Sequence, residues 1–100
     1  MISGFLSFLG LARKANRVIF GAESVMMNAN RIKLLLVASD AGNSSRRNAS
    51  HLAEKHGFKC LETSFGKAQL GYSIGCGPCA LIGITDPRFA ERIIEKNTPT

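Results

Sequence analysis

The stretch that decides the fold runs from Gly10 to Asp40 and reads GLARKANRVIFGAESVMMNANRIKLLLVASD. It starts with the basic end of a helix, continues through a short apolar step at Val18 and Ile19, and opens a second helix after Gly21. A wholly apolar run from Leu34 to Ala38 then ends at a Ser-Asp pair. A short, continuous apolar run between turn residues predicts a strand that is covered on both faces.

Helix and strand patterns alternate along the rest of the chain. The first helix carries apolar residues at helical spacing, namely Ile2, Phe5, Leu6, Leu9 and Ala12. Further helices are expected at residues 22–27, 45–56 and 66–74 and from Pro87 onward, and strands at 34–38, 58–62 and 80–85. Helices on both faces of a small sheet predict an α/β fold, a three-layer α/β/α sandwich with a mixed sheet of about four strands. We expect residues 1–100 to form one domain.

Three helix ends carry recognisable sequence signals. Asn43 or Ser44 can cap the helix that follows the central strand, because both side chains accept backbone N–H bonds. Gly57 stands where a glycine commonly ends such a helix. Asp86 can cap the final helix, and Pro87 occupies the first helical position that proline favours. These signals set the predicted boundaries in the second half of the chain.

The apolar N-terminal segment does not read as a signal peptide. Its cations, Arg13 and Lys14, follow the apolar run instead of preceding it, and no small-residue cleavage site comes after it. No apolar stretch approaches the length of a membrane span. We therefore expect a cytoplasmic protein that has no membrane partner and keeps its three cysteines as thiols.

The charge balance points to a polyanionic partner. Thirteen Lys and Arg residues against seven Asp and Glu residues give a formal net charge of +6. Such a surplus in a small domain favours binding to nucleic acid, although it can also serve solubility alone. One Tyr, six Phe and no Trp give little support for stacking single-stranded bases on aromatic side chains. A polyanion such as nucleic acid is therefore the partner that this composition favours.

The start of the second helix is the first candidate contact with phosphate. A helix begins with unpaired backbone N–H groups and a positive dipole end, which favour phosphate oxygens. Cations precede this helix at Lys14 and Arg17 and follow it at Arg31 and Lys33. We expect these residues to gather with the helix start at one end of the sheet.

The same residues carry a resemblance to a known family. The motifs are FLGLARKA at residues 8–15, Gly21, KLLLVASDA at residues 33–41 and LGYSIG at residues 70–75. Together they resemble the kink-turn-binding ribosomal proteins of the L-seven-Ae and L-thirty-e type, and within them the short bacterial YlxQ-like proteins. The resemblance covers about residues 3–95. It implies an α/β/α sandwich that binds structured RNA in a ribonucleoprotein.

The family's RNA site matches this chain only in part. Its kink-turn binders carry Gly-Thr-Asn-Glu at the second helix start and a Lys one turn later. Here Gly21 matches, but Ala22, Glu23 and Ser24 follow it, and Met27 takes the place of the Lys. Asn can donate to and accept from a guanine edge, whereas the carboxylate of Glu23 only accepts. The phosphate contacts survive this change, while the base-reading contact does not.

The family's second contact is the loop after the fourth helix, here residues 75–79, where small groups can approach extruded bases. Asp40 closes the matched strand motif and lies on the same candidate surface. The candidate RNA-binding residues are Lys14, Arg17, Gly21, Ala22, Glu23, Ser24, Arg31, Lys33, Asp40, Gly75, Cys76, Gly77, Pro78 and Cys79.

The loop also spells a rival motif. Cys76-Gly77-Pro78-Cys79 is the active-site tetrapeptide of thioredoxin-like redox proteins. In those proteins the motif follows a strand and opens a helix, whereas here it follows a predicted helix and precedes a strand. Cys60, His51 and His56 supply no second paired spacing for zinc. The tight Gly-Pro turn is therefore interpreted as structural, with dithiol chemistry kept as an alternative.

These observations predict a non-enzymatic RNA-binding protein that is associated with the ribosome or another ribonucleoprotein. Its partners would be structured RNA, with kinked RNA as one candidate, and neighbouring ribosomal proteins, with no cofactor, metal or catalytic residue. A protein-interaction module that kept the fold while RNA binding eroded is the first alternative. A dithiol redox protein acting through Cys76 and Cys79 is the second.

Overall fold

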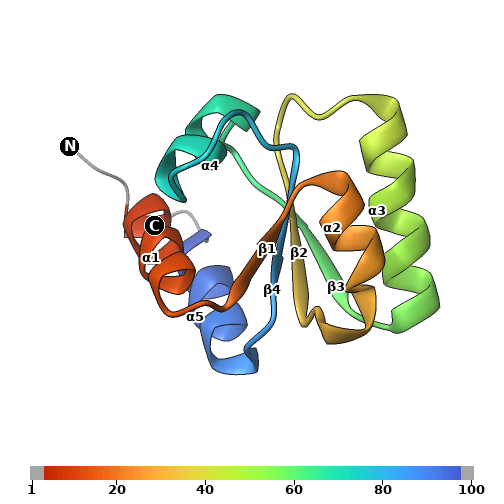
Figure 1. Ribbon diagram of the computed structural model, residues 1–100, viewed down its shortest axis with the longest axis horizontal. Helices are drawn as coiled ribbons and strands as arrows, with labels where there is room; N and C mark the ends of the chain where they lie inside the picture. The colour runs from red at the N-terminus through yellow and green to blue at the C-terminus, as the bar shows by residue number, and fades with distance from the viewer. Residues whose placement is uncertain (1–3, 98–100) are drawn as a thin grey trace.

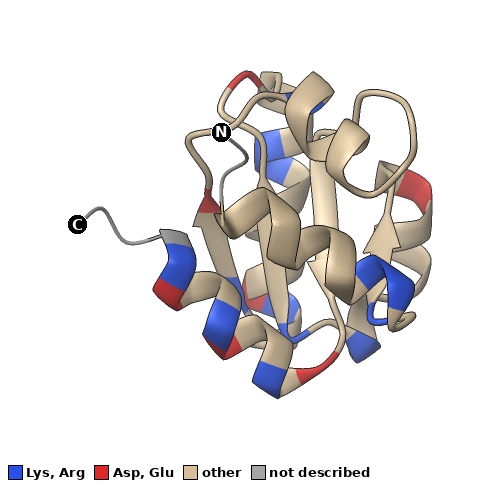
Figure 2. Ribbon diagram, turned by 90° about the vertical axis from the view of Figure 1, so that its left-hand side faces the viewer, with Lys and Arg blue, Asp and Glu red and all other residues tan. Residues whose placement is uncertain are grey.

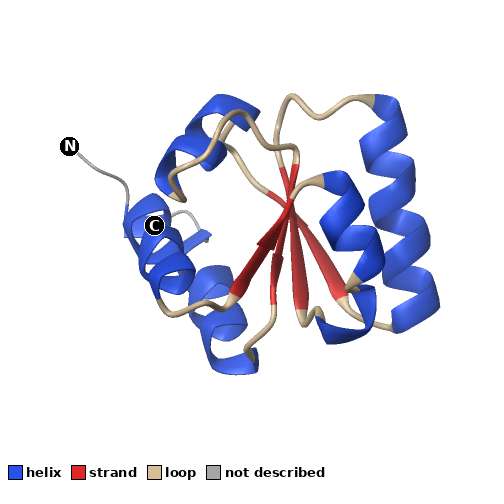
Figure 3. Ribbon diagram, viewed as in Figure 1, coloured by secondary structure: helices blue, strands red, loops and turns tan. Residues whose placement is uncertain are grey.

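The computed structural model describes residues 4–97, in which helices and strands alternate (Figure 1, Figure 3). The elements are α1 (Gly4–Lys14), β1 (Val18–Phe20), α2 (Ala22–Met27), the short 3-10 helix η1 (Ala29–Arg31), β2 (Leu34–Val37), α3 (Asn43–His56), β3 (Lys59–Glu62), α4 (Lys67–Ser73), β4 (Leu81–Ile84) and α5 (Pro87–Asn97). No helix among the described residues is long and apolar enough to cross a membrane.

The sheet has four strands in the order β1-β4-β2-β3. β4 runs antiparallel to both of its neighbours, whereas β2 and β3 are parallel, so the sheet is mixed. Figure 1 shows α1, α4 and α5 on one face of the sheet and α2 and α3 on the other. The predicted three-layer α/β/α sandwich with a mixed sheet of about four strands is confirmed.

The two central strands are buried along their whole length. Every residue of β2 and β4 is buried, as the continuous apolar run from Leu34 predicted. Fully buried Leu and Ile side chains from both strands pack against Leu9, Leu70 and Ile93 from the helices. Ile2 of the predicted N-terminal stripe lies outside the described residues, while Phe5, Leu9 and Ala12 of that stripe are buried.

The structure corrects two local predictions. The apolar step at Val18 and Ile19 is extended by Phe20 into a strand, because it pairs with the edge of β4. The helix predicted from residue 45 begins at Asn43, so neither Asn43 nor Ser44 caps it. Gly42 is the N-cap and has no side chain that could accept a bond.

The other two predicted helix-end signals are confirmed. Gly57 ends α3 with a left-handed φ of 76°, and Asp86 Oδ1 accepts the N–H groups of Arg88 and Phe89.

The strand directions define two ends of the sheet. The upper end, at the top of Figure 1, is where β1, β2 and β3 finish and β4 begins. The lower end is where β1, β2 and β3 begin and β4 finishes. A strand rises about 3.3 Å per residue, so residues that flank a four-residue strand lie roughly 16 Å apart.

Candidate nucleic-acid interface

The start of α2 and the end of the 75–79 loop meet at the upper end of the sheet. The N–H of Gly21 donates to the carbonyl oxygen of Leu81 over 3.2 Å, and the N–H of Ala38 donates to that of Ala80 over 2.9 Å. Gly21 adopts a φ of 90°, which favours glycine, and its backbone turns the chain from β1 into α2. The first bond places Gly21 beside the start of β4, which follows the 75–79 loop after one residue, so the two segments that the family resemblance assigns to RNA contact lie at the same end of the sheet.

α4 holds the 75–79 loop in place. The N–H of Cys76 donates to the carbonyl of Gly71 over 2.9 Å, and that of Cys79 donates to the carbonyl of Lys67 over 3.1 Å. The loop keeps Gly75, Gly77 and Pro78 exposed. Its backbone and small side chains therefore form an accessible and well-anchored edge.

The two loop cysteines lie in different environments. The Cys76 side chain is half-buried, whereas that of Cys79 is buried and its thiol donates to the Leu81 carbonyl over 3.1 Å. Burial raises the pKa of the Cys79 thiol, outweighing the backbone N–H of Gly21, which favours the thiolate. The half-buried Cys76 is therefore the more accessible sulfur of the pair. The motif also lies between α4 and β4, which is the order that the sequence predicted.

α2 is short and presents its first turn to solvent. It has six residues, and Ala22, Glu23 and Ser24 are exposed beside Gly21. Gly21 supplies no side chain to cap the helix, so the first backbone N–H groups have no side-chain partner. Because the helix has fewer than two full turns, its dipole adds little to the attraction of these groups for an anion.

The expected convergence of cations with the start of α2 is wrong, and three of the four residues stand at the opposite end of the sheet. Arg17 precedes β1, and its carbonyl accepts the N–H of Thr85 at the lower end. Lys33 precedes β2 and donates its N–H to Ile84, also at the lower end, while Arg31 lies in η1 just before it. The reason is that a residue before a strand and a residue after it stand at opposite ends of the sheet.

The fourth cation, Lys14, ends α1 and lines a groove between α1 and α4. The other residues that line this groove include Leu11, Phe65, Gln69 and Tyr72. Leu11 and Tyr72 are exposed large apolar side chains. Lys14 thus flanks the helix that carries the 75–79 loop instead of the start of α2.

Two cations that were not among the candidates lie nearer the upper end. The guanidinium of Arg13 stands 5.0 Å from the ring centre of Phe20, the residue immediately before Gly21. Lys67 begins α4, and its carbonyl accepts the N–H of Cys79. Arg13 adjoins Lys14 in the same basic pair, but the sequence gives no sign of which of the two reaches back along β1.

Asp40 lies at the upper end, where its carboxylate stabilises the protein backbone. Its Oδ1 accepts the N–H of Lys67 over 2.8 Å, so it caps α4 from another part of the chain. A Cβ on Gly66 would stand 3.2 Å from the other carboxylate oxygen, which shows how closely the two loops pack. This contact fixes the start of α4 relative to the end of β2.

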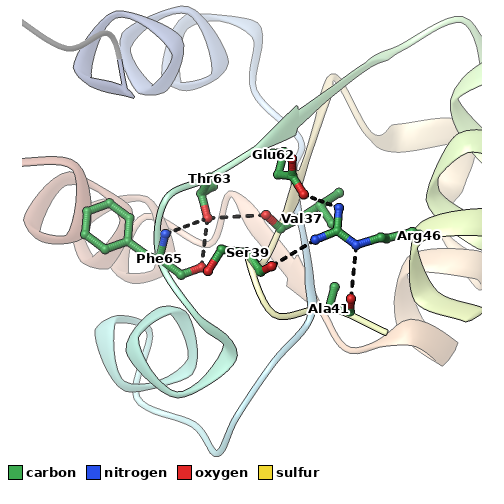
Figure 4. Close-up of polar contacts among 7 residues, drawn as sticks. All are labelled: Val37, Ser39, Ala41, Arg46, Glu62, Thr63 and Phe65. Atoms are coloured by element: carbon green, nitrogen blue, oxygen red, sulfur yellow. Dashed lines mark hydrogen bonds and ion pairs between the residues drawn. The ribbon is translucent and has the colours of Figure 1, made fainter. Parts of the chain in front are cut away.

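Arg46 fixes the neighbouring loops (Figure 4). Its guanidinium donates to the carbonyl oxygens of Ala41 and Ser39 over 3.0 and 2.9 Å and pairs with the carboxylate of Glu62. The buried hydroxyl of Thr63 is shared between the carbonyls of Val37 and Phe65. These contacts tie together the loops at the upper end of the sheet. Among the described residues, no group of three or more His, Cys, Asp or Glu side chains could hold a metal ion.

Comparison with known proteins identifies the family. No protein-family model matches the chain. Over 90 residues it is 31% identical to a protein named RNA-binding protein YlxQ of Bacillus subtilis (strain 168), with 86% of this chain and 87% of that protein covered. The chain belongs to the YlxQ family. This confirms the relationship that the sequence motifs indicated.

Solved structures share the fold of this YlxQ-family chain. A Bacillus halodurans protein, described as being of unknown function, has a TM-score of 0.87 at 24% identity and covers 95% of this chain and 97% of its own. The Giardia lamblia 15.5kD RNA binding protein has a TM-score of 0.73 at 17% identity and covers 92% of this chain and 82% of its own. At these identities the likeness establishes the fold.

Proposed function

We propose that this YlxQ-family protein binds structured RNA through the upper end of its sheet, as a non-enzymatic component of the ribosome or another ribonucleoprotein. The observation that carries the proposal is the 3.2 Å bond between Gly21 and Leu81, which places the start of α2 beside the first residue of β4, just after the 75–79 loop. A curated relative with 31% identity is named an RNA-binding protein, which supports RNA as the partner.

Two kinds of contact would hold the RNA. The exposed backbone of Ala22, Glu23 and Ser24 would meet a phosphate, and Arg13 and Lys67 would neutralise its neighbours. Gly75 and Gly77 carry no side chain, and a Cβ built on either would meet no atom within 4 Å. Extruded bases could therefore approach the backbone of this loop closely.

Glu23 sets the expected preference among RNAs. A carboxylate beside the RNA backbone repels phosphate and has no donor to offer a guanine edge. We therefore expect binding to RNA that presents a bend or an internal loop. The affinity for a kink-turn should be lower than an Asn at this position would give. Neighbouring ribosomal proteins would complete the assembly in the cytoplasm.

The test is a salt series of binding to three RNAs, namely a kink-turn RNA, a plain duplex and total ribosomal RNA. Arg13→Ala and Lys67→Ala should each weaken binding to all three and shallow the salt slope by about 0.7–0.9. Arg92→Ala on α5 is the matched control, because it removes the same charge from an exposed helix face that also carries acidic residues (Figure 2). Equal effects of all three changes would show that the upper end has no special role.

Exposed methionines favour a second candidate, a protein-interaction module. Met26 and Met27 on α2 are 53% and 76% exposed, and flexible thioethers suit adaptable protein interfaces. If the wild-type protein binds none of the three RNAs at moderate salt while Met27→Lys abolishes capture of a ribosomal protein, this candidate would replace RNA binding.

A further inference from the structure

The lower end of the sheet carries a row of cations. Arg17 and Lys33 flank the last residues of β4, because the carbonyl of Arg17 accepts the N–H of Thr85 and the N–H of Lys33 donates to Ile84. Lys59 begins β3 and pairs in register with Leu34, the residue after Lys33. Three of the four strands therefore begin at or just after a cation.

The spacing of this row suits a phosphate backbone. Neighbouring strands lie about 4.8 Å apart, so the backbones of Lys33 and Lys59 are close neighbours and Arg17 stands roughly 10 Å away across β4. Arg31 in η1 adds a fourth cation next to Lys33. All four side chains are exposed. We call Arg17, Arg31, Lys33 and Lys59 the lower cation row.

Carboxylates at this end leave most of the positive charge uncompensated. Asp86 is only 13% exposed and uses one oxygen to accept the N–H groups that begin α5. It pairs with Arg17 at 3.8 Å and with Arg88 at 3.9 Å, yet these cations remain 53% and 89% exposed. Glu54, on the last turn of α3, is accompanied there by Lys55. The lower cation row therefore faces solvent with a net positive charge.

We propose that the lower cation row is a second RNA surface, which binds the sugar-phosphate backbone without reading bases, so that one protein joins two RNA segments from opposite ends of its sheet. This inference rests on the proposed function for the existence of the first segment. Exposed lysines on a row suit phosphates, whereas protein interfaces are depleted in Lys. With overall dimensions of 36 × 27 × 26 Å, the protein would hold the two segments about one protein diameter apart.

The test is a bridging assay with two RNAs. Total ribosomal RNA is immobilised on beads, the protein is added and washed, and capture of a fluorescent plain RNA duplex is measured at about 0.1 M salt. The triple variant Arg31→Ala, Lys33→Ala and Lys59→Ala leaves Arg17 and its pair with Asp86 intact. The control variant Arg47→Ala, Arg92→Ala and Lys96→Ala removes the same charge from the exposed faces of α3 and α5.

We expect the wild-type and control proteins to capture the duplex and the triple variant to lose capture by about tenfold or more, while still binding the beads. Equal capture by the triple variant, or RNA binding by the wild type without any capture, would overturn the second surface and leave the proposed function intact. No binding of the wild type to the beads would overturn both. Light scattering of the RNA-free protein measures whether it dimerises, because a dimer could join two RNAs through two copies of the upper end. Capture by the triple variant that is explained by such a dimer would count against the second surface.

Discussion

Gly71 and Gly77 approach each other so closely that no side chain fits on Gly71. A Cβ built on Gly71 would stand 2.0 Å from the carbonyl oxygen of Gly77, well inside van der Waals contact. The obstructing atom belongs to the backbone of the 75–79 loop, which is also bonded to α4 through Cys76 and Cys79. The position of the proposed RNA-contacting loop therefore depends on a glycine in the helix behind it.

Gly71→Ala should destabilise the protein, because relief of the clash requires the loop to move away from α4. Overpacking of this kind costs about 1–3 kcal/mol in the free energy of unfolding, and urea denaturation measures it. Gly77→Ala is the matched control, since its methyl group would meet no atom within 4 Å. A Gly71→Ala protein as stable as the wild type would show that the loop is not held against α4 as described.

Glu23→Asn should strengthen binding to kinked RNA in particular. The change removes a repelling carboxylate and adds an amide that can both donate to and accept from a base edge, and such a contact contributes about 1–3 kcal/mol of discrimination. Glu95→Asn on α5 removes an equal charge away from the start of α2 and serves as the control. A gain of the same size for a plain duplex would mean that only the charge of Glu23 matters.

Asp86 should make stability depend on acid. Burial opposes its ionisation, but the N–H groups of Arg88 and Phe89 and the charges of Arg88 and Arg17 outweigh it, so its pKa lies below the ordinary value. A lowered pKa stabilises the folded state above the ordinary pKa of about 3.9, and this stabilisation is lost as the pH falls through the lower, folded-state value.

Asp86→Asn should accordingly lower the melting temperature at neutral pH. The difference from the wild type should shrink as the pH falls below about 4 and through the lowered pKa of Asp86, where the wild-type carboxylate also becomes neutral. A difference that stays constant over that range would assign the effect to the shape of the side chain instead of its charge. Glu91→Asn, an exposed change on the helix that Asp86 caps, provides the baseline.

The loop cysteines should contribute no dithiol chemistry. The motif precedes β4 instead of opening a helix, so it lacks the helix start that lowers a thiol pKa in redox motifs of this type. Replacing Cys76 and Cys79 by Ser should leave the folding and RNA binding nearly intact, since a serine hydroxyl can still donate to the carbonyl that the Cys79 thiol contacts. Reduction of insulin by the wild type, lost in either single Ser variant, would instead support the redox alternative.

The sequence was most informative where a structure follows from neighbours in the chain. Three features depend only on residues close by in the sequence. They are the apolar run of β2, the glycine that ends α3 and the Asp-Pro start of α5. β1 was harder to predict, because three residues make a strand only when β4 is present to pair with them. The capping of α4 by Asp40 joins positions 27 residues apart and has no local signal.

In the candidate site, too, local motifs were predicted correctly, whereas positions that depend on the fold were not. Gly21 and the 75–79 loop were matched by motifs, and the structure brings them together through Gly21 and Leu81. The cations were assigned to the start of α2 because they lie near it in the sequence. That reasoning fails when a strand intervenes, because β1 carries the chain from the lower end at Arg17 to the upper end at Gly21. Arg13 was missed because its side chain reaches back to Phe20, a contact that depends on how α1 packs beside β1.

The most direct test of RNA binding at the upper end is an amide NMR titration of the isotope-labelled protein with a structured ribosomal RNA fragment. We predict that the first and largest shifts occur at Gly21, Ala22 and Ser24 and at Gly75 and Gly77, with the lower cation row responding only at higher RNA concentration. Shifts confined to other parts of the molecule, with the amides of Gly21 and Gly77 unchanged at saturation, would contradict the account.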